Sequence, residues 1–201
     1  MLILPNEFEA ARDWLAHRLD TVRLPPGGDV HTEEDTTPAA VLVPIILHRE
    51  GPTVLFTKRT EKLAKHAGQI SFPGGRMEIG ETAEAAALRE TEEEVGIATQ
   101  LVTPVGRLVQ YTTITRYRVT PVVGLLEPGF TLRLQADEVA EAFEVPLSFL
   151  LQRGNFLEKT VNLPGRPAVT YALDWQGKII WGATAGMLMT LYKTLIDEEH
   201  P

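Results

Sequence analysis

The stretch from Gly75 to Ile97 reads GRMEIGETAEAAALRETEEEVGI and organises the rest of the chain. Its opening is a glycine-rich turn, because the glycines at its start and at Gly80 allow a positive φ or a close approach to a ligand. Alanine and leucine dominate from Thr82 onward, which favours a helix. Thr82 is placed to cap this helix and Gly96 is placed to end it.

Three glutamates gather on one side of the predicted helix. At about 100° per residue, Glu93 and Glu94 fall in a narrow arc on either side of Glu90. The face that we expect to be buried carries Leu88, Thr91 and Val95. Like charges at this spacing repel one another by a few tenths of a kcal/mol per pair, and a shared divalent cation reverses that cost. The glutamates by themselves leave two interpretations open, a site for a hard cation such as Mg²⁺ and a solvated acidic helix face.

Length and composition limit the class of protein. The 201 residues suit one domain with extra elements. The chain has no cysteine, which excludes a disulfide framework, a thiolate metal site and a cysteine nucleophile. The opening MLILPNEFEA has no basic region and its apolar run ends at Pro5, so it does not resemble a signal peptide. No stretch approaches the roughly 20 apolar residues of a membrane span, and we expect a cytoplasmic protein with no membrane partner.

The charge of the chain is acidic overall but basic in one place. A net charge of −8 argues against a nucleic-acid partner, because such binders carry a basic footprint. The local basic cluster comprises Lys58, Arg59, Lys62, Lys65 and Arg76. These side chains lie close in sequence to the glycine turn, so they are placed to meet phosphates while a metal ion neutralises the glutamates.

The remaining elements are predicted from periodicity. Residues 6–19 form an amphipathic helix that leads into a linker, so that residues 1–37 pack on a domain of residues 38–201. The apolar runs at 39–47 and 53–58 predict an antiparallel pair of strands, in which Pro44 indicates an edge position or a bulge. Further strands are expected at residues 101–109, 117–126, 160–172 and 178–181, and a second apolar helix at 183–195.

The central stretch resembles the signature of the Nudix hydrolases. Gly75, five residues, Glu81, seven residues and then RETEEEVGI from Arg89 to Ile97 match the fixed Gly, Glu and Arg positions of the Nudix box. Thr91 departs from the pattern, since a bulky aliphatic residue is usual there. The resemblance implies an α/β (α+β) fold, in which a mixed β-sheet lies between helices as an α/β/α sandwich and the box helix faces the site.

The sequence before the box narrows this resemblance. Residues 55–75 are similar to the signature of the coenzyme A diphosphatase branch, which has a Leu-Leu-Thr-x-Arg opening and ends in Phe-Pro-Gly-Gly. Phe56 replaces the second leucine and Ala64 replaces a second arginine, for which the adjacent Lys65 lacks the same planar fork. The segment from Trp181 to Ala185 also resembles that branch, so the likeness covers most of the chain.

The resemblance implies a metal-dependent hydrolysis of a diphosphate linkage. Coenzyme A or an acyl derivative would yield 4′-phosphopantetheine and adenosine 3′,5′-bisphosphate. Glu90 and Glu94 would hold Mg²⁺ or Mn²⁺, and Glu93 would share the metal or take a proton from the attacking water. Arg89 would orient the glutamates, and Gly74 and Gly75 would shape the turn beside the phosphates.

Several alternatives remain open at the level of sequence. The same box also serves hydrolysis of ADP-ribose, dinucleotides or nucleoside triphosphates, and a nucleotide-sensing module that does not cleave its ligand is a third interpretation. Three downstream glutamates are candidates for a further metal ligand or for the base, namely Glu138, Glu141 and Glu144. The oligomeric state is not fixed by the sequence, which is compatible with a homodimer.

Overall fold

The structure is a computed structural model that describes residues 4–29, 35–61, 67–163 and 166–196. Helices lie at α1 (Phe8–Thr21), α2 (Ala83–Val95), α3 (Leu147–Leu150) and α4 (Ala183–Ile196), with 3₁₀ turns η1 (Thr99–Leu101) and η2 (Arg153–Asn155). Strands lie at β1 (Gly27–Gly28), β2 (Thr37–His48), β3 (Gly51–Arg59), β4 (Ile70–Ser71), β5 (Gly74–Arg76), β6 (Thr103–Arg107), β7 (Tyr111–Thr112), β8 (Tyr117–Leu126), β9 (Val139–Pro146), β10 (Leu157–Leu163), β11 (Arg166–Trp175) and β12 (Lys178–Trp181).

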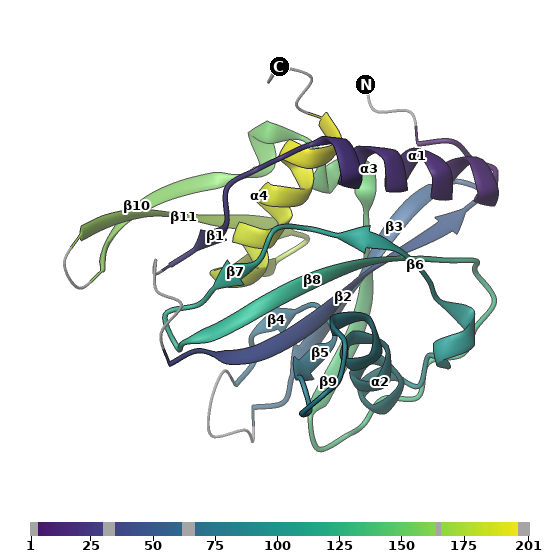
Figure 1. Ribbon diagram of the computed structural model, residues 1–201, viewed down its shortest axis with the longest axis horizontal. Helices are drawn as coiled ribbons and strands as arrows, with labels where there is room; N and C mark the ends of the chain where they lie inside the picture. Colours follow the sequence, from purple (N-terminus) through teal and green to yellow (C-terminus); the bar gives the residue numbers. More distant parts are fainter. Residues whose placement is uncertain (1–3, 30–34, 62–66, 164–165, 197–201) are drawn as a thin grey trace.

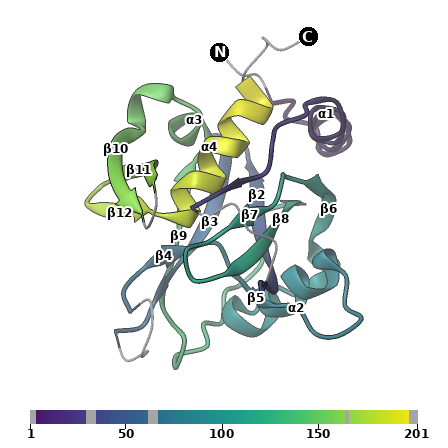
Figure 2. The ribbon, with the colours of Figure 1, turned by 60° about the vertical axis from the view of Figure 1, so that its left-hand side comes forward.

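A large mixed sheet forms the middle of the molecule. Its main path runs β1-β7-β8-β2-β3-β4, and β5, β6 and β9 pair with β2, β8 and β3 respectively. β2 is parallel to β8 and antiparallel to β3, so the sheet is mixed as predicted. Figures 1 and 2 show α2 on one face of this sheet and α1 with α4 on the other. This arrangement confirms the expected α/β/α sandwich.

Both faces of the sheet are covered because the central strand is apolar on both sides. Along β2, Val43 and Ile45 belong to the core beneath α1 and α4, whereas Leu42 and Ile46 belong to the core beneath α2. Successive side chains of a strand point to opposite faces, so one continuous apolar run supplies both layers. The uninterrupted apolar run in the sequence therefore reflects a strand buried on two sides.

The prediction for Pro44 is wrong, because β2 is a central strand. Pro44 lies opposite Gly124 of β8 in the parallel ladder. On its other side β2 pairs with β5 only as far as Val41 and with β3 only from Ile45 onward. Pro44 has no N–H to donate. Its backbone nitrogen faces the same side of the strand as that of Leu42, and the N–H of Leu42 donates to the carbonyl of Pro73 at 2.9 Å. Proline is tolerated because it falls in the gap between these two partner strands.

The C-terminal strands also differ from the prediction of one strand at 160–172. The chain forms an antiparallel hairpin of β10 and β11, with Leu157 opposite Ala172 and Leu163 opposite Arg166. β12 adds a third strand to this separate small sheet. Leu173 and Ile180 on its inward face are fully buried in the core that includes α4.

The N-terminal helix begins at Phe8 and ends at Thr21, two residues later at each end than predicted. Its buried residues Ala11, Leu15 and Leu19 join the core on the α4 side of the sheet.

The division of the chain at residue 37 stays a prediction. Among the described residues, no helix has the length and apolar character that crossing a membrane requires.

Candidate active site

The helix α2 forms as its sequence predicts. The Thr82 hydroxyl accepts the N–H of Ala85 at 3.2 Å, which caps the first turn. Gly96 adopts a left-handed conformation with φ of 75° and ends the last turn. Thr91, which departs from the Nudix pattern, is fully buried, and its hydroxyl donates to the carbonyl of Ala87 at 2.6 Å. The helix thus satisfies this buried polar group without disturbing the packing face.

The three glutamates of the helix line one pocket. Glu90, Glu93 and Glu94 share a pocket of about 360 Å³ with two residues from the segment that precedes β9, Gln135 and Glu138. The three helix carboxylates differ in depth. Glu94 is only 5% exposed, the Glu90 side chain is 19% exposed and the Glu93 side chain is 60% exposed. The pocket therefore has a buried acidic floor and an exposed acidic rim.

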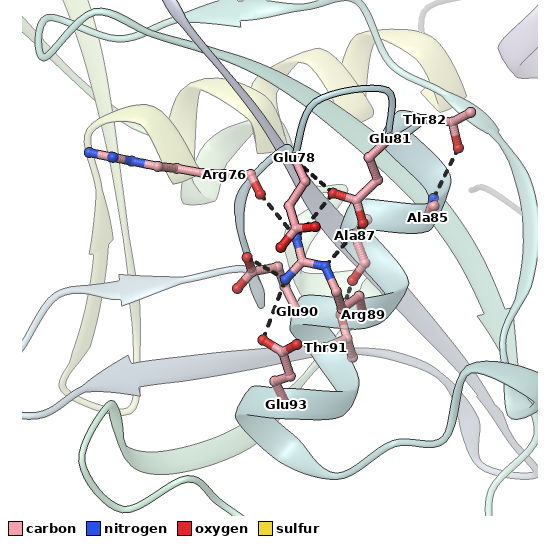
Figure 3. A network of polar contacts seen from close by, with 10 residues as sticks. All are labelled: Arg76, Glu78, Glu81, Thr82, Ala85, Ala87, Arg89, Glu90, Thr91 and Glu93. Carbon is pink, nitrogen blue, oxygen red and sulfur yellow. Dashed lines mark hydrogen bonds and ion pairs between the residues drawn. The ribbon is translucent and has the colours of Figure 1, made fainter.

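Arg89 holds part of this acidic cluster in place (Figure 3). Its guanidinium donates to both carboxylate oxygens of Glu81, at 3.0 and 3.1 Å, and to Glu90 Oε1 at 2.9 Å. A longer contact of 3.4 Å reaches Glu93 Oε2, and Nη2 also donates to the carbonyl of Arg76 at 3.1 Å. Because a bidentate guanidinium–carboxylate pair is directional, Arg89 fixes the carboxylate of Glu90 relative to the turn before the helix.

Glu81 closes this network from the glycine turn. Its Oε2 accepts the backbone N–H of Glu78 at 2.9 Å in addition to the bond from Arg89. The hydrogen bond from Arg89, followed by that from the backbone, lowers the pKa of Glu81. Glu81 thereby stays ionised and joins the turn to the helix.

Two glycines are required before the turn because the backbone there lies too close to neighbouring atoms to carry a side chain. A Cβ on Gly75 would lie 2.5 Å from the carboxyl carbon of Glu90. Gly74 has φ of 150°, and a Cβ there would lie 2.4 Å from the carbonyl oxygen of Ala40 in β2. The N–H of Gly74 donates to Glu94 Oε2 at 3.3 Å. The glycines therefore let β5 run directly beside the two carboxylates.

Burial changes the protonation of the deepest carboxylate. Desolvation raises the pKa of Glu94 to about 8, with the charges of Glu90 and Glu138 acting in the same direction. The N–H of Gly74 and the charge of Arg59 oppose this rise. Burial likewise raises the pKa of Glu90, against the influence of Arg89. A cation in the pocket would offset the repulsion that contributes to these shifts.

We expect the metal-free protein to lose stability as this carboxylate ionises. The folded pKa of Glu94, about 8, lies above its ordinary value of 4.5, so the folded state binds more protons between these values. The contribution is fully present below pH 4.5 and is lost as the pH rises through 8, by at most about 1.4 kcal/mol per pH unit. Glu94→Gln lacks this titration. With a chelator present, the melting temperature of the variant minus that of the parent protein should grow from pH 6 to pH 8, and a constant difference would contradict the assignment.

The donor set fits a hard divalent cation. The pocket offers carboxylate and amide oxygens, which Mg²⁺ and Mn²⁺ prefer. Across the ranges that the structure describes, no three acidic or histidine side chains converge closely enough to enclose an ion together. Mg²⁺ commonly uses only one or two protein carboxylates and completes its shell with water and substrate phosphates. The arrangement suits an ion that takes some of its ligands from the protein and the others from water and from the phosphates of a substrate.

The predicted basic residues separate into distinct environments. Arg59 ends β3 and acts electrostatically on Glu94, and its Nε is buried with no hydrogen-bond partner among the described residues. Lys58 is partly exposed, and its Nζ lies 4.0 Å from Glu61 Oε1. Two members of the cluster lie outside the described residues, Lys62 and Lys65. Among the members of the basic cluster that the structure describes, Arg59 is thus the residue brought to the glutamates.

The side chain of Arg76 does not join this group. It points away from Arg89 in Figure 3, and its Nε and Nη2 donate to the hydroxyl of Tyr117 at 3.1 and 2.7 Å. The guanidinium also lies over the Tyr117 ring, 5.5 Å from the centroid. Arg76 is therefore connected to the site through its backbone carbonyl, which accepts from Arg89, and not through its charged side chain.

Of the three downstream glutamates, the structure brings only Glu138 to the pocket. Glu141 pairs with Lys178 at 2.5 Å, and Glu144 accepts from Thr53 and lies 2.7 Å from His48 Nε2. The segment that carries Glu138 is held on the end of α2 by backbone bonds. The N–H of Arg133 donates to the carbonyl of Val95 at 2.8 Å, and that of Gln135 to the carbonyl of Glu94 at 2.9 Å.

Sequence reasoning did not identify Gln135, and it left Glu138 as one of three equal candidates. Neither residue belongs to a local pattern, because each is more than 35 positions away from the helix glutamates. The spacing of the acidic residues in 138–144 could not distinguish the three glutamates from one another, since they follow at equal intervals of three residues. Only the docking of this segment on α2 distinguishes Glu138 from the other two.

Comparisons with known proteins agree with this architecture. Residues 36–160 match the NUDIX domain family. The chain is 40% identical over 154 residues to the uncharacterized Nudix hydrolase NudL of Cronobacter sakazakii, covering 76% of this chain and 80% of that one. It is 36% identical over 185 residues to the protein of the same name from Salmonella paratyphi B, covering 92% and 96%.

A solved structure supports the fold independently. The MutT/nudix family protein from Enterococcus faecalis superposes with a TM-score of 0.56 at 18% sequence identity, covering 84% of this chain and 65% of that one. At this identity the likeness shows the fold alone. The domain match and the sequence relatives carry the assignment further, and the chain therefore belongs to the Nudix hydrolase family, whose members hydrolyse pyrophosphate bonds.

Proposed function

We propose that the protein hydrolyses the diphosphate linkage of coenzyme A or an acyl-coenzyme A with Mg²⁺ or Mn²⁺. The products would be 4′-phosphopantetheine, or its acyl form, and adenosine 3′,5′-bisphosphate. The observation that carries the diphosphatase activity is the acidic pocket around Glu90 and Glu94, where burial raises the pKa of both carboxylates. The choice of coenzyme A rests on the resemblance of residues 55–75, in which Ala64 is the main departure.

In this proposal the metal ligands are Glu90 and Glu94, with Glu93 as a shared ligand. The bound ion would lower the pKa of a water molecule and offset charge on the phosphoryl oxygens. Arg89 keeps Glu90 oriented through the bonds that also hold Glu81. The N–H of Gly74 and the backbone of Gly75 bring the turn beside the carboxylates, where the diphosphate would lie.

Two carboxylates are candidates for the general base. Glu93 is exposed at the rim of the pocket, from which it can accept a proton from the attacking water. Its long contact to Arg89 ties it to the residue that orients Glu90. Glu138 lines the same pocket from the opposite segment and makes no ion pair within the described residues. Comparing Glu93→Gln with Glu138→Gln in pH–rate profiles separates the two roles.

Arg59 is the residue that we assign to the phosphates. Its buried Nε lacks a partner in the described part of the chain, although a buried donor normally has one. In this proposal a phosphate oxygen of the substrate would accept from Arg59, whose charge acts on Glu94, a residue that would hold the metal ion. Lys58, one residue earlier on β3, is exposed enough to meet a more distant phosphate of the substrate.

We therefore expect Arg59→Lys to weaken substrate binding. Lysine keeps the positive charge but loses the planar fork, so KM should rise by about tenfold or more with a smaller change in kcat. Steady-state kinetics at saturating Mg²⁺ measures both parameters. Arg49→Lys serves as the matched control, since Arg49 lies in the exposed turn between β2 and β3 and should leave both unchanged. An unchanged KM for Arg59→Lys would remove Arg59 from the phosphate site.

A substrate panel tests the proposed function directly. The purified protein is incubated with Mg²⁺ or Mn²⁺ and with coenzyme A, acetyl-coenzyme A, ADP-ribose, diadenosine polyphosphates or nucleoside triphosphates, and products are identified by mass. We expect adenosine 3′,5′-bisphosphate from the coenzyme A substrates. Cleavage of ADP-ribose while coenzyme A stays intact would replace coenzyme A with the alternative substrate class. Tight binding of a nucleotide without any cleavage would instead indicate a sensing module.

A further inference from the structure

Three exposed apolar side chains lie together on the outward face of the small sheet. The register places Leu157 of β10 opposite Ala172 of β11, and Ala172 opposite Trp181 of β12. Residues that are directly opposite in a ladder share a face, so these three positions form one row across the strands. Ile179 precedes Trp181 by two residues and joins the same face. Leu157, Trp181 and Ile179 are 64%, 52% and 46% exposed.

This face is unusual because the opposite face is already the packed one. Leu173 and Ile180 point inward and are fully buried in the core that includes α4. An antiparallel sheet with one face on the core normally presents polar residues on the other. The remaining exposed large apolar residues that the structure describes are separate from this row: Ile79, Leu101, Ile114, Leu134 and Val169. A cluster of this kind marks an interaction surface, whereas single exposed residues do not.

Two opposite charges flank the apolar row. Lys159 of β10 lies one row toward the turn between β10 and β11, opposite Thr170. Asp174 of β11 lies one row away on the other side, opposite Ile179. Both side chains are exposed, and neither forms an ion pair within the described residues. The Asp174 carboxylate accepts the backbone N–H of Gly177 at 2.8 Å through Oδ1.

The order of positive, apolar and negative rows is complementary to itself. In a symmetric pair, the outward faces of the two small sheets would lie against each other. The two-fold axis would lie between these sheets, parallel to the apolar row and perpendicular to the strands. Rotation about this axis places the apolar row of one copy over the same row of the other. It also exchanges the flanking rows, so that Lys159 of each copy approaches Asp174 of the other. The symmetry thus creates two equivalent ion pairs around one apolar centre.

We propose that this face, made of Leu157, Lys159, Ala172, Asp174, Ile179 and Trp181, joins two copies of the chain in a symmetric homodimer. The charge pattern favours a second copy over an unrelated partner, because one chain supplies both complementary halves. Trp181, at the β12 end of the row, provides a large aromatic anchor of the kind that dominates the energetics of many interfaces. In Figure 1 the β10–β11 hairpin extends beyond the main sheet, away from α2, so dimer formation leaves the acidic pocket open. The proposal does not depend on the identity of the substrate.

Charge reversal tests the proposed pairing. Lys159→Glu or Asp174→Lys alone places like charges at both symmetric positions, so each should raise the dimer dissociation constant at least about tenfold. The double variant restores opposite charges and should return the constant to within about threefold of the parent value. Sedimentation equilibrium over a concentration series measures the constant. Lys193→Glu is the matched control, since Lys193 is an exposed lysine on α4 and its reversal should leave dimerisation unchanged.

The outcomes separate the dimer from other uses of this face. A parent protein that is monomeric at all concentrations would overturn the proposal, and so would a dimer that is indifferent to both single reversals. Trp181→Ala, checked for folding by circular dichroism, should produce monomers that still hydrolyse the substrate. A Trp181→Ala protein that stays dimeric but loses substrate affinity would assign the face to the substrate instead.

Discussion

Replacing Glu94 with glutamine should lower kcat by about 10³-fold while the fold is retained. Glu94 is the most buried carboxylate of the pocket, and it is held by the N–H of Gly74 close to the charge of Arg59. An amide lacks the negative charge that a divalent ion needs, and loss of about 4 kcal/mol of charge stabilisation corresponds to a thousandfold change in rate. Glutamine has the shape of the protonated acid, so the core beside α2 should pack as before.

The experiment combines turnover with metal binding. Turnover of the best substrate is measured at saturating Mg²⁺, and Mn²⁺ affinity is measured by calorimetry for the variant and the parent protein. Glu92→Gln provides the control, because Glu92 is an exposed glutamate on the same helix and does not line the pocket. Native-like turnover of Glu94→Gln would remove Glu94 from the metal site, while loss of activity in both variants would indicate general damage to α2.

Adding one methyl group at Gly75 should also abolish most of the activity. The new Cβ would lie 2.5 Å from the carboxyl carbon of Glu90, a separation that real side chains do not adopt. Either β5 or Glu90 must therefore move, and Glu90 is tied to Arg89 at 2.9 Å. Displacement of a catalytic group by about 1 Å commonly costs on the order of 10²-fold in rate, and we expect a loss of at least this size for Gly75→Ala.

The control for this prediction is another glycine with no such neighbour. A Cβ added at Gly154 would meet no atom within 4 Å, and Gly154 does not adopt a positive φ, so Gly154→Ala should leave turnover unchanged. Thermal unfolding of both variants separates a local shift at the pocket from loss of the fold. Full activity in Gly75→Ala would show that the close approach of β5 to Glu90 is not required for catalysis.

Comparison of particular residues shows how far local sequence determines the site. The glutamates of α2 share a pocket because helical periodicity fixes their directions, and the caps at Thr82 and Gly96 follow from their own side chain and backbone preferences. The direction of Arg76 could not be predicted, since it depends on Tyr117, which lies 41 residues later. Nor could the different depths of Glu93 and Glu94 be predicted, because they depend on the sheet beneath the helix.

The sequence by itself determined the position of α2 and the family, because these depend on short-range periodicity and on fixed spacing, and the mixed sheet was expected only from the resemblance to that family. Only the tertiary structure decided that Pro44 lies in a central strand, that Glu138 rather than Glu141 or Glu144 reaches the pocket, and that β10 and β11 form a hairpin. Each of these outcomes depends on which segments pair or dock across long stretches of chain. The burial that raises the pKa of Glu94 is likewise a property of the assembled layers and not of the helix alone.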